Sequence, residues 1–366
     1  MIVKLKDVTL FSKGKQINGS ELSEEGKFPY LNGGIKPSGN WNMANTKANT
    51  VTISEGGNSC GYVNFMKEPF WCGAHCYYFY STKGNSKYLY YALKSQQNKI
   101  MKLRSGACMP NIKKNDLANF EFEYDFNEIN QNLVVNKLDK IQEIIDIRME
   151  QIRQLEELVK ARFVELFGDT ILNPYGWNVV TVGDIVTDVR YGTSKPAVEG
   201  GKYPYLRMNN LTYDGHLDLS DMKYIDISDN EIEKCIVRKG DVLFNRTNSI
   251  ELVGKTCVFD LDDDMVIAGY IIRVRLNEKL LPIVLSSYLN LPSLKEQLRS
   301  MAKGAVNQAN INAQELQSIK IYLPPIELQN QFATFVEQTD KSKLEYKKSL
   351  VEMQNLMESL MNQYFS

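Results

Sequence analysis

Two segments of the chain repeat apolar residues at alternating spacings of four and three. The positions of the first are Val134, Leu138, Ile141, Ile145, Arg148, Ile152, Leu155, Val159, Arg162 and Leu166. Those of the second are Phe332, Val336, Thr339, Lys343, Tyr346, Leu350, Met353, Met357, Leu360 and Tyr364. This spacing is typical of the a and d positions of a coiled coil. We therefore expect two long helices, the first running from Leu133 to Phe167 over about 50 Å.

The polar exceptions in the two seams fall at different places, Arg148 and Arg162 in the first and Thr339 and Lys343 in the second. Seams of equal length with polar residues at different heights suit pairing with each other, so an internal coiled coil is expected. Helices that bind a partner protein are the alternative. The residues expected to pair are Leu138, Ile141, Ile145, Ile152, Leu155, Val159, Val336, Leu350, Met353, Met357 and Leu360.

The two helical segments belong to a larger repeat. Gln151–Phe167 and Ser349–Phe365 match in pattern at an offset of 198 residues. A unit of that length is a domain plus a helix, because solenoid repeats recur about every 20–50 residues. The motif Phe28-Pro29-Tyr30-Leu31 returns as Tyr203-Pro204-Tyr205-Leu206 at an offset of 175, so the second copy carries about 23 additional residues between these landmarks.

A region of short β-type runs, broken by glycine and proline, precedes each helix. The expected strands lie in Asn49–Ser54, Cys60–Phe65, Trp71–Tyr80, Asp241–Asn245, Lys255–Phe259 and Met265–Leu276, and short helices in Lys87–Leu103 and Ile283–Met301. The sequence therefore predicts an α+β protein with two β-rich domains and two long helices. The expected boundaries are a first domain at 1–126, a central helix at 127–169, a second domain at 170–322 and a C-terminal helix at 323–366.

The amino-acid composition limits which kinds of partner the protein can bind and in which cell compartment it is expected. With 43% hydrophobic residues the 366-residue chain has ample material for two cores, and its net charge of −1 means that any surface for nucleic acid must be a local patch. The apolar runs are too short to span a bilayer, so no membrane is expected. The six cysteines do not form a disulfide framework in a chain of this size, which favours a reduced, cytoplasmic protein.

Several motifs come close to catalytic or metal-binding patterns without completing them. Cys72-Gly73-Ala74-His75-Cys76 invites zinc, but a structural zinc needs four ligands and buried strand cysteines are the more common case. Ser249–Thr256 lacks the first glycine of a phosphate-binding loop. Asn173-Pro174-Tyr175 lacks the second proline of the adenine-methyltransferase motif and fits a turn after a helix. With only two histidines and no cofactor loop, we predict no catalytic residue and no metal.

The chain resembles the specificity (S) subunits of Type I restriction–modification systems. The residues that carry the resemblance are Arg162–Asp169 followed by Asn173–Trp177, Gly304–Gln308 followed by Leu323–Gln329, and Tyr191–Lys195 followed by Tyr205–Asn210. The first copy departs from the pattern, with Met109-Pro110-Asn111 in place of the glutamine turn and Phe122-Glu123-Tyr124 in place of Pro-Pro.

This resemblance implies a division of labour. Each repeat would begin with a target recognition domain that reads half of a split, double-stranded DNA sequence. The two helices would pack antiparallel and set the gap between the half-sites, giving an approximate two-fold axis within the chain. Two methyltransferase subunits, using S-adenosylmethionine, would dock on the helices, and two motor–nuclease subunits, using ATP and Mg²⁺, would join them. The chain itself would be non-catalytic and carry no cofactor.

Polar, glycine-punctuated loops next to the expected strands supply the candidate DNA contacts, because such loops on a rigid scaffold carry most binding residues. In the first domain these are Lys13, Lys15, Asn58, Ser59 and His75. In the second they are Tyr191, Thr193, Ser194, Lys195, Arg207, Asn209, Asn210, Asn245, Arg246 and Asn248. The alternatives are a freestanding DNA-modifying enzyme, which would need a cofactor loop and a catalytic motif, and a coiled-coil protein adaptor.

Overall fold

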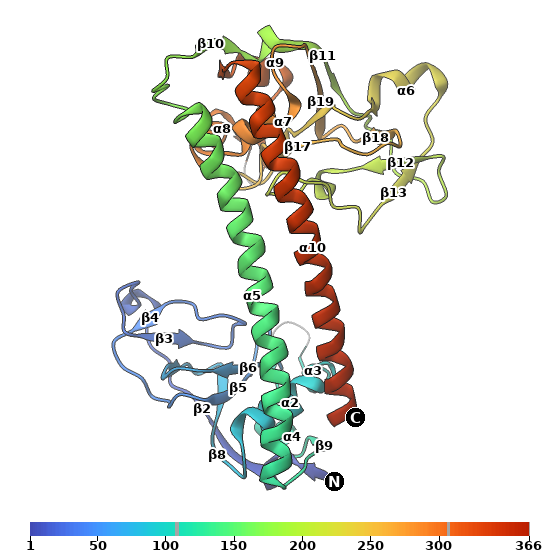
Figure 1. Cartoon of the computed structure of the whole chain (residues 1–366). Helices are drawn as coiled ribbons and strands as arrows, with labels where there is room; N and C mark the ends of the chain where they lie inside the picture. The colour runs from blue at the N-terminus through green and yellow to red at the C-terminus, as the bar shows by residue number, and fades with distance from the viewer. Residues whose placement is uncertain (107–109, 306–307, 366) are drawn as a thin grey trace. The chain divides into compact units, whose positions relative to one another are not determined.

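The computed structural model describes residues 1–106, 110–305 and 308–365, and the chain divides into two compact units. Unit 1 comprises Met1–Met149 and Lys347–Ser366, and unit 2 comprises Glu150–Tyr346. Both long helices are present as α5 (Glu128–Phe167) and α10 (Ile326–Phe365), each of 40 residues (Figure 1). The division falls within these helices, whereas the boundaries expected from the sequence lie at their ends. Those boundaries stay a prediction.

Unit 1 is built on three small sheets that precede α5. Its strands are β1 (Ile2–Lys4), β2 (Thr9–Lys13), β3 (Phe28–Leu31), β4 (Asn40–Trp41), β5 (Thr50–Ser54), β6 (Val63–Met66), β7 (Trp71–Cys72), β8 (Cys76–Thr82) and β9 (Glu121–Glu123). Its short helices are α1 (Leu5–Val8), η1 (Gly19–Glu21), α2 (Ser86–Ser95), α3 (Gln97–Met101) and α4 (Lys114–Ala118). The sheets have the strand orders β1-β9, β2-β8-β5-β6 and β4-β3-β7.

Unit 2 repeats this plan with additions. Its strands are β10 (Asn178–Thr181), β11 (Val186–Tyr191), β12 (Tyr203–Leu206), β13 (Lys223–Ile225), β14 (Ile236–Val237), β15 (Val242–Asn245), β16 (Thr247–Asn248), β17 (Thr256–Val258), β18 (Met265–Ile267), β19 (Ile271–Leu276), β20 (Lys303–Ala305), β21 (Gln308–Asn310) and β22 (Lys320–Leu323). Its short helices are η2 (Val182–Ile185), η3 (Met208–Asn210), α6 (Asp229–Cys235), α7 (Pro282–Asn290), α8 (Pro292–Met301) and α9 (Ala313–Ser318).

The strand orders show that the two units share one topology. The orders β10-β22, β11-β19-β15-β17 and β13-β12-β18-β14 in unit 2 match the three sheets of unit 1 strand for strand, with β14 added. In each unit one pair is parallel within an otherwise antiparallel sheet, β3 with β7 and β12 with β18. Helix α6 and β14 account for part of the longer second copy. The predicted α+β fold class and internal repeat are confirmed.

Each unit has one main core, where the central sheet, the short helices and parts of both long helices meet. In unit 1 this core includes Leu138, Ile141 and Ile145 of α5 and Met357 and Phe365 of α10, all buried. Leu350, Met353 and Leu360 pack partly buried against the same core. In unit 1 the apolar seam residues of both helices therefore pack into the core of the β-rich domain that precedes α5.

The corresponding core of unit 2 includes Phe163 and Phe167 of α5 and Phe332 and Val336 of α10, with Val159 packed against it. Phe163 and Phe167 each lie one residue after a seam position of α5, whereas Phe332 is itself a seam position of α10. The Phe163 and Phe332 rings meet edge to face at 5.3 Å. Ile152 and Leu155 are half-buried.

The segments of α5 and α10 run antiparallel within each unit. In unit 1, Arg148 Nε donates to Ser349 Oγ at 3.3 Å, and Lys137 Nζ lies 3.3 Å from Tyr364 Oη. As the residue number rises along α5, the number of its neighbour on α10 falls. The same holds in unit 2, where Glu156 pairs with Lys343 and Phe163 packs on Phe332.

A buried glutamine fixes the start of each long helix. Gln329 Oε1 accepts from Leu281 N–H at 2.9 Å and its Nε2 donates to the carbonyl of Pro324. Gln131, 198 residues earlier, accepts from Asn85 N–H at 2.7 Å and donates to the carbonyl of Asp125 at 2.6 Å. The first copy therefore keeps the glutamine of the helix-start pattern even though it lacks the two prolines.

Two expected strands are each two strands in the structure, so the single-strand prediction was wrong there. Trp71–Tyr80 is split into β7 and β8, which belong to different sheets. Gly73 lies between them, and a Cβ at this position would lie 2.2 Å from the side chain of Asn32. Met265–Leu276 is split in the same way into β18 and β19. The chain crosses from one sheet to the next at these points, which a period-two pattern does not reveal.

Two expected helices are also split, Lys87–Leu103 into α2 and α3 and Ile283–Met301 into α7 and α8. Pro292 begins α8, and a proline disfavours helical backbone in the residue before it, which explains the second break. The expected turns at Gly304–Gln308 and Met109–Asn111 include residues outside those described. Among the described helices, none is long and apolar enough to cross a membrane.

Candidate nucleic-acid interface

A hollow of about 460 Å³ lies in unit 2 where strand ends from its two four-stranded sheets meet. Three loops line it, each directly after a strand: residues 193–197 after β11, 207–209 after β12 and Arg246 after β15. The link between β18 and β19 completes the wall. The hollow brings together the sequence-predicted residues Thr193, Ser194, Lys195, Arg207, Asn209 and Arg246.

Arg246 is held on both sides by its main chain. Its N–H donates to the carbonyl of Tyr270 at 2.9 Å, and its carbonyl accepts from Ile311 N–H at 2.9 Å. The guanidinium carbon lies 4.8 Å from the centre of the Tyr191 ring, a cation–π arrangement. Tyr191 is itself fixed, because its hydroxyl accepts from Ala313 N–H at 2.8 Å.

Two other cations at the hollow are paired with carboxylates. Lys195 lies 2.5 Å from Glu231, and Arg207 lies 2.7 Å from Asp221. The hydrogen bonds from these cations lower the pKa of both carboxyl groups. Exposed pairs of this kind contribute little stability, so a DNA phosphate can take the place of the carboxylate at small cost.

Three candidate asparagines support the loops. Asn210 is buried, donates to the carbonyl of Asp218 at 2.8 Å and accepts from Arg207 N–H at 2.9 Å. Asn245 is fully buried and donates to the carbonyls of Thr247 and Tyr270. Its side-chain oxygen accepts from Asn248 at 2.8 Å. These amides are occupied by the protein's own groups, whereas Ser194 and Asn209 are exposed at the rim.

In unit 1 the corresponding region centres on Glu55, which sequence reasoning missed. Lys13 Nζ pairs with one carboxylate oxygen of Glu55, and His75 Nδ1 lies 3.9 Å from the other. The Glu55 side chain is only 13% exposed, while Lys13 and His75 are exposed. Glu55 N–H donates to the carbonyl of His75 at 2.8 Å, and its carbonyl accepts from Ile112 N–H at 2.9 Å. The sequence did offer one signal for Glu55, because this residue directly follows the predicted strand Asn49–Ser54.

The remaining candidates of unit 1 lie around this group. Lys15 is exposed, and its N–H donates to the carbonyl of Cys72 at 2.9 Å. Asn58 is exposed, and the half-buried Ser59 donates its hydroxyl to the carbonyl of Gly33. Lys15 and Asn58 can therefore reach a ligand, and Ser59 holds a loop.

Glu55 and Arg246 occupy equivalent positions in the two units. Each follows the end of a central strand, and each has the same pair of main-chain hydrogen bonds. The facing loops match as well: the bonds are Gly14 to Cys76 and Gly192 to Ile271, each 3.1 Å, and Lys15 to Cys72 and Thr193 to Ile267, each 2.9 Å. One scaffold thus presents Lys13 with Glu55 in unit 1 and Tyr191 with Arg246 in unit 2.

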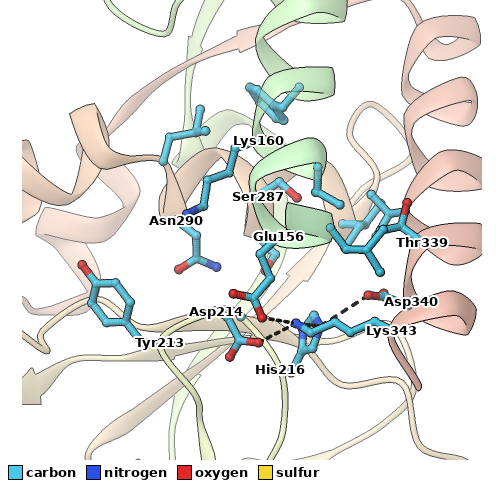
Figure 2. Close-up of a pocket in the computed structure, with 18 residues that line it drawn as sticks. Glu156, Lys160, Tyr213, Asp214, His216, Ser287, Asn290, Thr339, Asp340 and Lys343 are labelled. Atoms are coloured by element: carbon cyan, nitrogen blue, oxygen red, sulfur yellow. Dashed lines mark hydrogen bonds and ion pairs between the residues drawn. The ribbon is translucent and has the colours of Figure 1, made fainter. Parts of the chain in front are cut away.

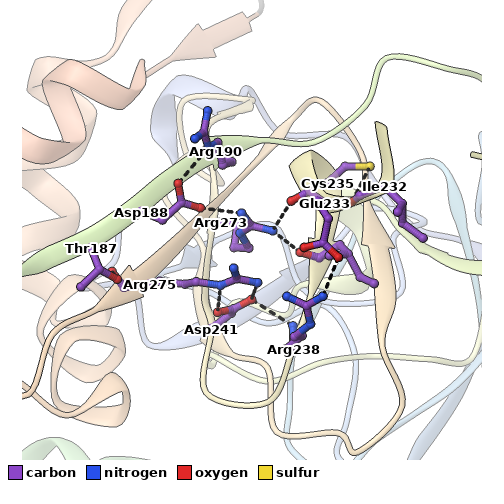
Figure 3. Close-up of polar contacts among 11 residues, drawn as sticks. Thr187, Asp188, Arg190, Ile232, Glu233, Cys235, Arg238, Asp241, Arg273 and Arg275 are labelled. Atoms are coloured by element: carbon purple, nitrogen blue, oxygen red, sulfur yellow. Dashed lines mark hydrogen bonds and ion pairs between the residues drawn. The ribbon is translucent and has the colours of Figure 1, made fainter. Parts of the chain in front are cut away.

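A buried ionic network stabilises the sheet that presents Arg246 (Figure 3). Arg273 of β19 has a side chain only 1% exposed, donates to Asp188 of β11 at 2.5 Å and also donates to the carbonyl of Ile236. Arg275 pairs with Asp241 at 2.9 Å. Burial opposes ionisation of Asp188, but the hydrogen bonds from Arg273 and Arg190 hold the pKa of this carboxyl below its ordinary value.

Replacing Arg273 by methionine is expected to lower the free energy of unfolding by about 3 kcal/mol. Asp188 would lose its buried partner and keep only Arg190, and the carbonyl of Ile236 would lose the donor that Arg273 supplies. Urea denaturation at pH 7 measures this change. The double variant Arg273→Met, Asp188→Leu should recover most of the loss, since no buried charge is left unpaired. Equal stability of the single variant and the wild type would contradict the structural role of the network.

A second polar group lies in a cavity of about 150 Å³ in unit 2, lined by α5, α7, α10 and the loop 213–216 (Figure 2). Lys343 is buried and pairs with Glu156 at 2.6 Å and Asp214 at 2.7 Å. His216 lies 3.3 Å from Asp340. Lys343 is one of the polar exceptions in the seam, so this cluster explains its presence there.

The near-miss motifs have structural roles. Asn173, with a left-handed φ of 46°, caps a turn by bonding to the backbone of Trp177. Residues 249–256 turn into β17 and are not followed by a helix. Cys72 donates its thiol to the carbonyl of Cys76, and both are buried. Across residues 1–106, 110–305 and 308–365, no three His, Cys, Asp or Glu side chains gather as metal ligands do. Cys108 lies outside the described residues.

Two equivalent β-rich domains, each with polar loops at matching strand ends and each followed by a long helix, define a double recognition module. The chain belongs to the family of Type I restriction modification DNA specificity domains, whose model matches residues 1–157 and 174–352. The resemblance drawn from the sequence is confirmed.

Relatives agree with this assignment. The chain is 31% identical over 211 residues to a Mycoplasma genitalium protein that bears the name type I specificity subunit, covering 53% of this chain and 54% of that protein. It is 26% identical over 291 residues to the Type I restriction enzyme EcoKI specificity subunit of Escherichia coli, covering 74% and 62%. The chain thus spans little more than half the length of the curated relatives it matches.

The fold is that of a solved relative. The crystal structure of the Type I restriction–modification S subunit from M. genitalium matches with a TM-score of 0.64 at 22% identity, covering 100% of this chain and 96% of that one.

Proposed function

We propose that the chain is the DNA-specificity subunit of a Type I restriction–modification complex. Each β-rich domain reads one half of a bipartite target, and the paired helices set the spacing between the halves. The observation that carries this proposal is the duplication of one scaffold with different side chains at the same loops. The scaffold is kept while Lys13 and Glu55 are replaced by Tyr191 and Arg246, as expected of two readers with different targets.

The long helices also offer surfaces for the methyltransferase subunits. Large apolar side chains lie exposed on both helices, where a solvated face would be polar. They include Leu133, Ile144, Ile147, Met149 and Leu158 on α5 and Leu344, Val351 and Leu356 on α10, and each of these is between 39% and 56% exposed. In this proposal S-adenosylmethionine belongs to those subunits, and ATP with Mg²⁺ to the motor–nuclease subunits that join them.

Sequencing of modified bases in host DNA tests the proposal. With this chain and its methyltransferase subunits expressed, N6-methyladenine is expected in both halves of one split motif. The homogeneous chain alone should transfer no labelled methyl group to the same DNA. A motif without an unspecified gap, or methylation that persists when the gene for this chain is deleted, would contradict the proposed role.

A further inference from the structure

We propose that Glu55 and Arg246 are the equivalent base-reading residues of the two domains and select opposite partners of a G·C pair. Arg246 would donate to O6 and N7 of a guanine, and Glu55 would accept from the N4 amino group of a cytosine. This inference rests on the proposed function and adds to it a named position and base in each half-site.

The backbone supports treating the two residues as one position. In both domains the residue directly follows the central strand and has its N–H and its carbonyl fixed by matching hydrogen bonds of 2.8–2.9 Å. The Cβ atom therefore leaves the scaffold in the same direction in each domain. A difference in side chain at such a position changes what is read without changing how the domain is built.

The surroundings of Arg246 suit a reader of guanine. Among the described residues no carboxylate pairs with Arg246, and the side chain's only bond to the protein is a long one, 3.4 Å, to the carbonyl of Gly269. Its Nε is buried without a partner. The Tyr191 ring holds the plane of the guanidinium, which lines the hollow of about 460 Å³. A planar fork held in this way matches the two major-groove acceptors of guanine.

The surroundings of Glu55 suit recognition of cytosine. A carboxylate at a DNA surface is repelled by phosphates, so it is tolerated where it accepts from a base amino group, and cytosine N4 is the usual donor. Lys13 neutralises one oxygen of Glu55, while the other faces His75 at 3.9 Å. Glu55 therefore has a cation at one oxygen and keeps acceptor capacity at the other.

The experiment uses the complex of the chain with its methyltransferase subunits. Arg246→Gln and Glu55→Gln are compared with the charge-matched controls Lys239→Gln and Glu68→Gln. Both control side chains are exposed, and they precede the strands β15 and β7 respectively. Methylation rates are measured on duplexes that carry each of the four bases at every target position. Glutamine prefers adenine, so each variant should lose about 5- to 150-fold of its discrimination at one base pair, a guanine in one half and a cytosine in the other.

The unmutated half-site serves as an internal measure of folding, because a misfolded subunit would lose both halves. Arg246→Lys keeps the charge but removes the fork, and should relax the same base pair. An unchanged motif and unchanged rates in the variants would overturn this inference and leave the proposed function standing. A uniform loss on all sequences with a shallower salt dependence would also overturn it, because that result identifies phosphate contacts. A wild-type complex without a split motif would instead overturn the proposed function.

Discussion

Replacing Lys343 by methionine is expected to lower the free energy of unfolding by about 3–5 kcal/mol at pH 7, the range for breaking a buried ion pair. The Lys343 side chain is 5% exposed and lies between two carboxylates, Glu156 at 2.6 Å and Asp214 at 2.7 Å. Burial opposes its charge, but the hydrogen bonds with Asp214 and Glu156 hold the pKa of Lys343 above its ordinary value. Without the ammonium group, the two carboxylates face each other in a partly buried cavity.

The effect should depend on pH in a defined direction. Burial acts against the charged form of Asp214, but the hydrogen bond with Lys343 holds the pKa of this carboxyl well below its usual range. A lowered carboxyl pKa contributes stability that is present above its ordinary value near 4 and is lost as the pH falls through the folded-state pKa. The variant lacks this contribution from Asp214, so its difference from the wild type should stay constant between pH 7 and about pH 5 and should narrow as the pH falls below about 4.

The neighbouring histidine acts with the opposite sign. The hydrogen bond with Asp340 raises the pKa of His216. The stability from this pair is therefore fully present below the ordinary histidine value of about 6.5 and is lost as the pH rises through the folded-state pKa. Wild-type stability should thus decline slightly from pH 6 to pH 8, and His216→Gln should remove that decline.

Lys341→Met is the matched control for Lys343→Met. Lys341 is 72% exposed and pairs with Glu337 one helical turn away, so its replacement should change the free energy of unfolding by less than about 1 kcal/mol. Urea denaturation followed by circular dichroism measures the stability of the wild type, the two lysine variants and the histidine variant. Equal losses for the two lysine variants would show that the cavity cluster has no special role.

Lys343 also shows where reading the sequence reaches its limit. The four–three spacing predicted both helices, because that pattern depends only on neighbours along one helix. In a heptad pattern Lys343 appears only as a polar interruption. Its partner Asp214 lies 129 residues away, on a loop that β12 and β13 bring to the helix, and local periodicity carries no information about such a contact.

The candidate interface, like the Lys343 cluster, was only partly predictable from the sequence. The change to polar residues after the β-type run Asp241–Asn245 pointed to Arg246. The pattern Tyr191–Lys195 followed by Tyr205–Asn210 pointed to Lys195 and Arg207, and all three residues line one hollow. Residue type alone could not show that the amide of Asn245 is consumed inside the loop. Glu55 was not among the predicted contacts, and only the matching backbone bonds reveal its equivalence to Arg246.

On the proposed function, the spacing between the half-sites should depend on the long helices alone. Inserting four residues after Met149 in α5 and four after Tyr346 in α10 is expected to lengthen the unspecified gap of the target without changing a specific base. Both insertions fall at the limits of the two units, so the Lys343 cluster and the loops around Glu55 and Arg246 keep their residues. Inserting in both helices preserves the antiparallel register, which a single insertion would shift by one turn.

The expected size of the change follows from helix geometry. Four residues add about 6 Å, close to two base-pair steps of about 3.4 Å, and rotate one end by only about 40° because about 3.6 residues make a turn. Exchanging residues 1–126 for another recognition domain should do the reverse, altering one half-site and preserving the gap. Sequencing of methylated adenines in cells that express each variant with the methyltransferase subunits reads both quantities at once. If the helix insertions altered the specific bases and left the gap unchanged, the helices would not set the half-site spacing. The proposed division of roles between domains and helices would then be wrong.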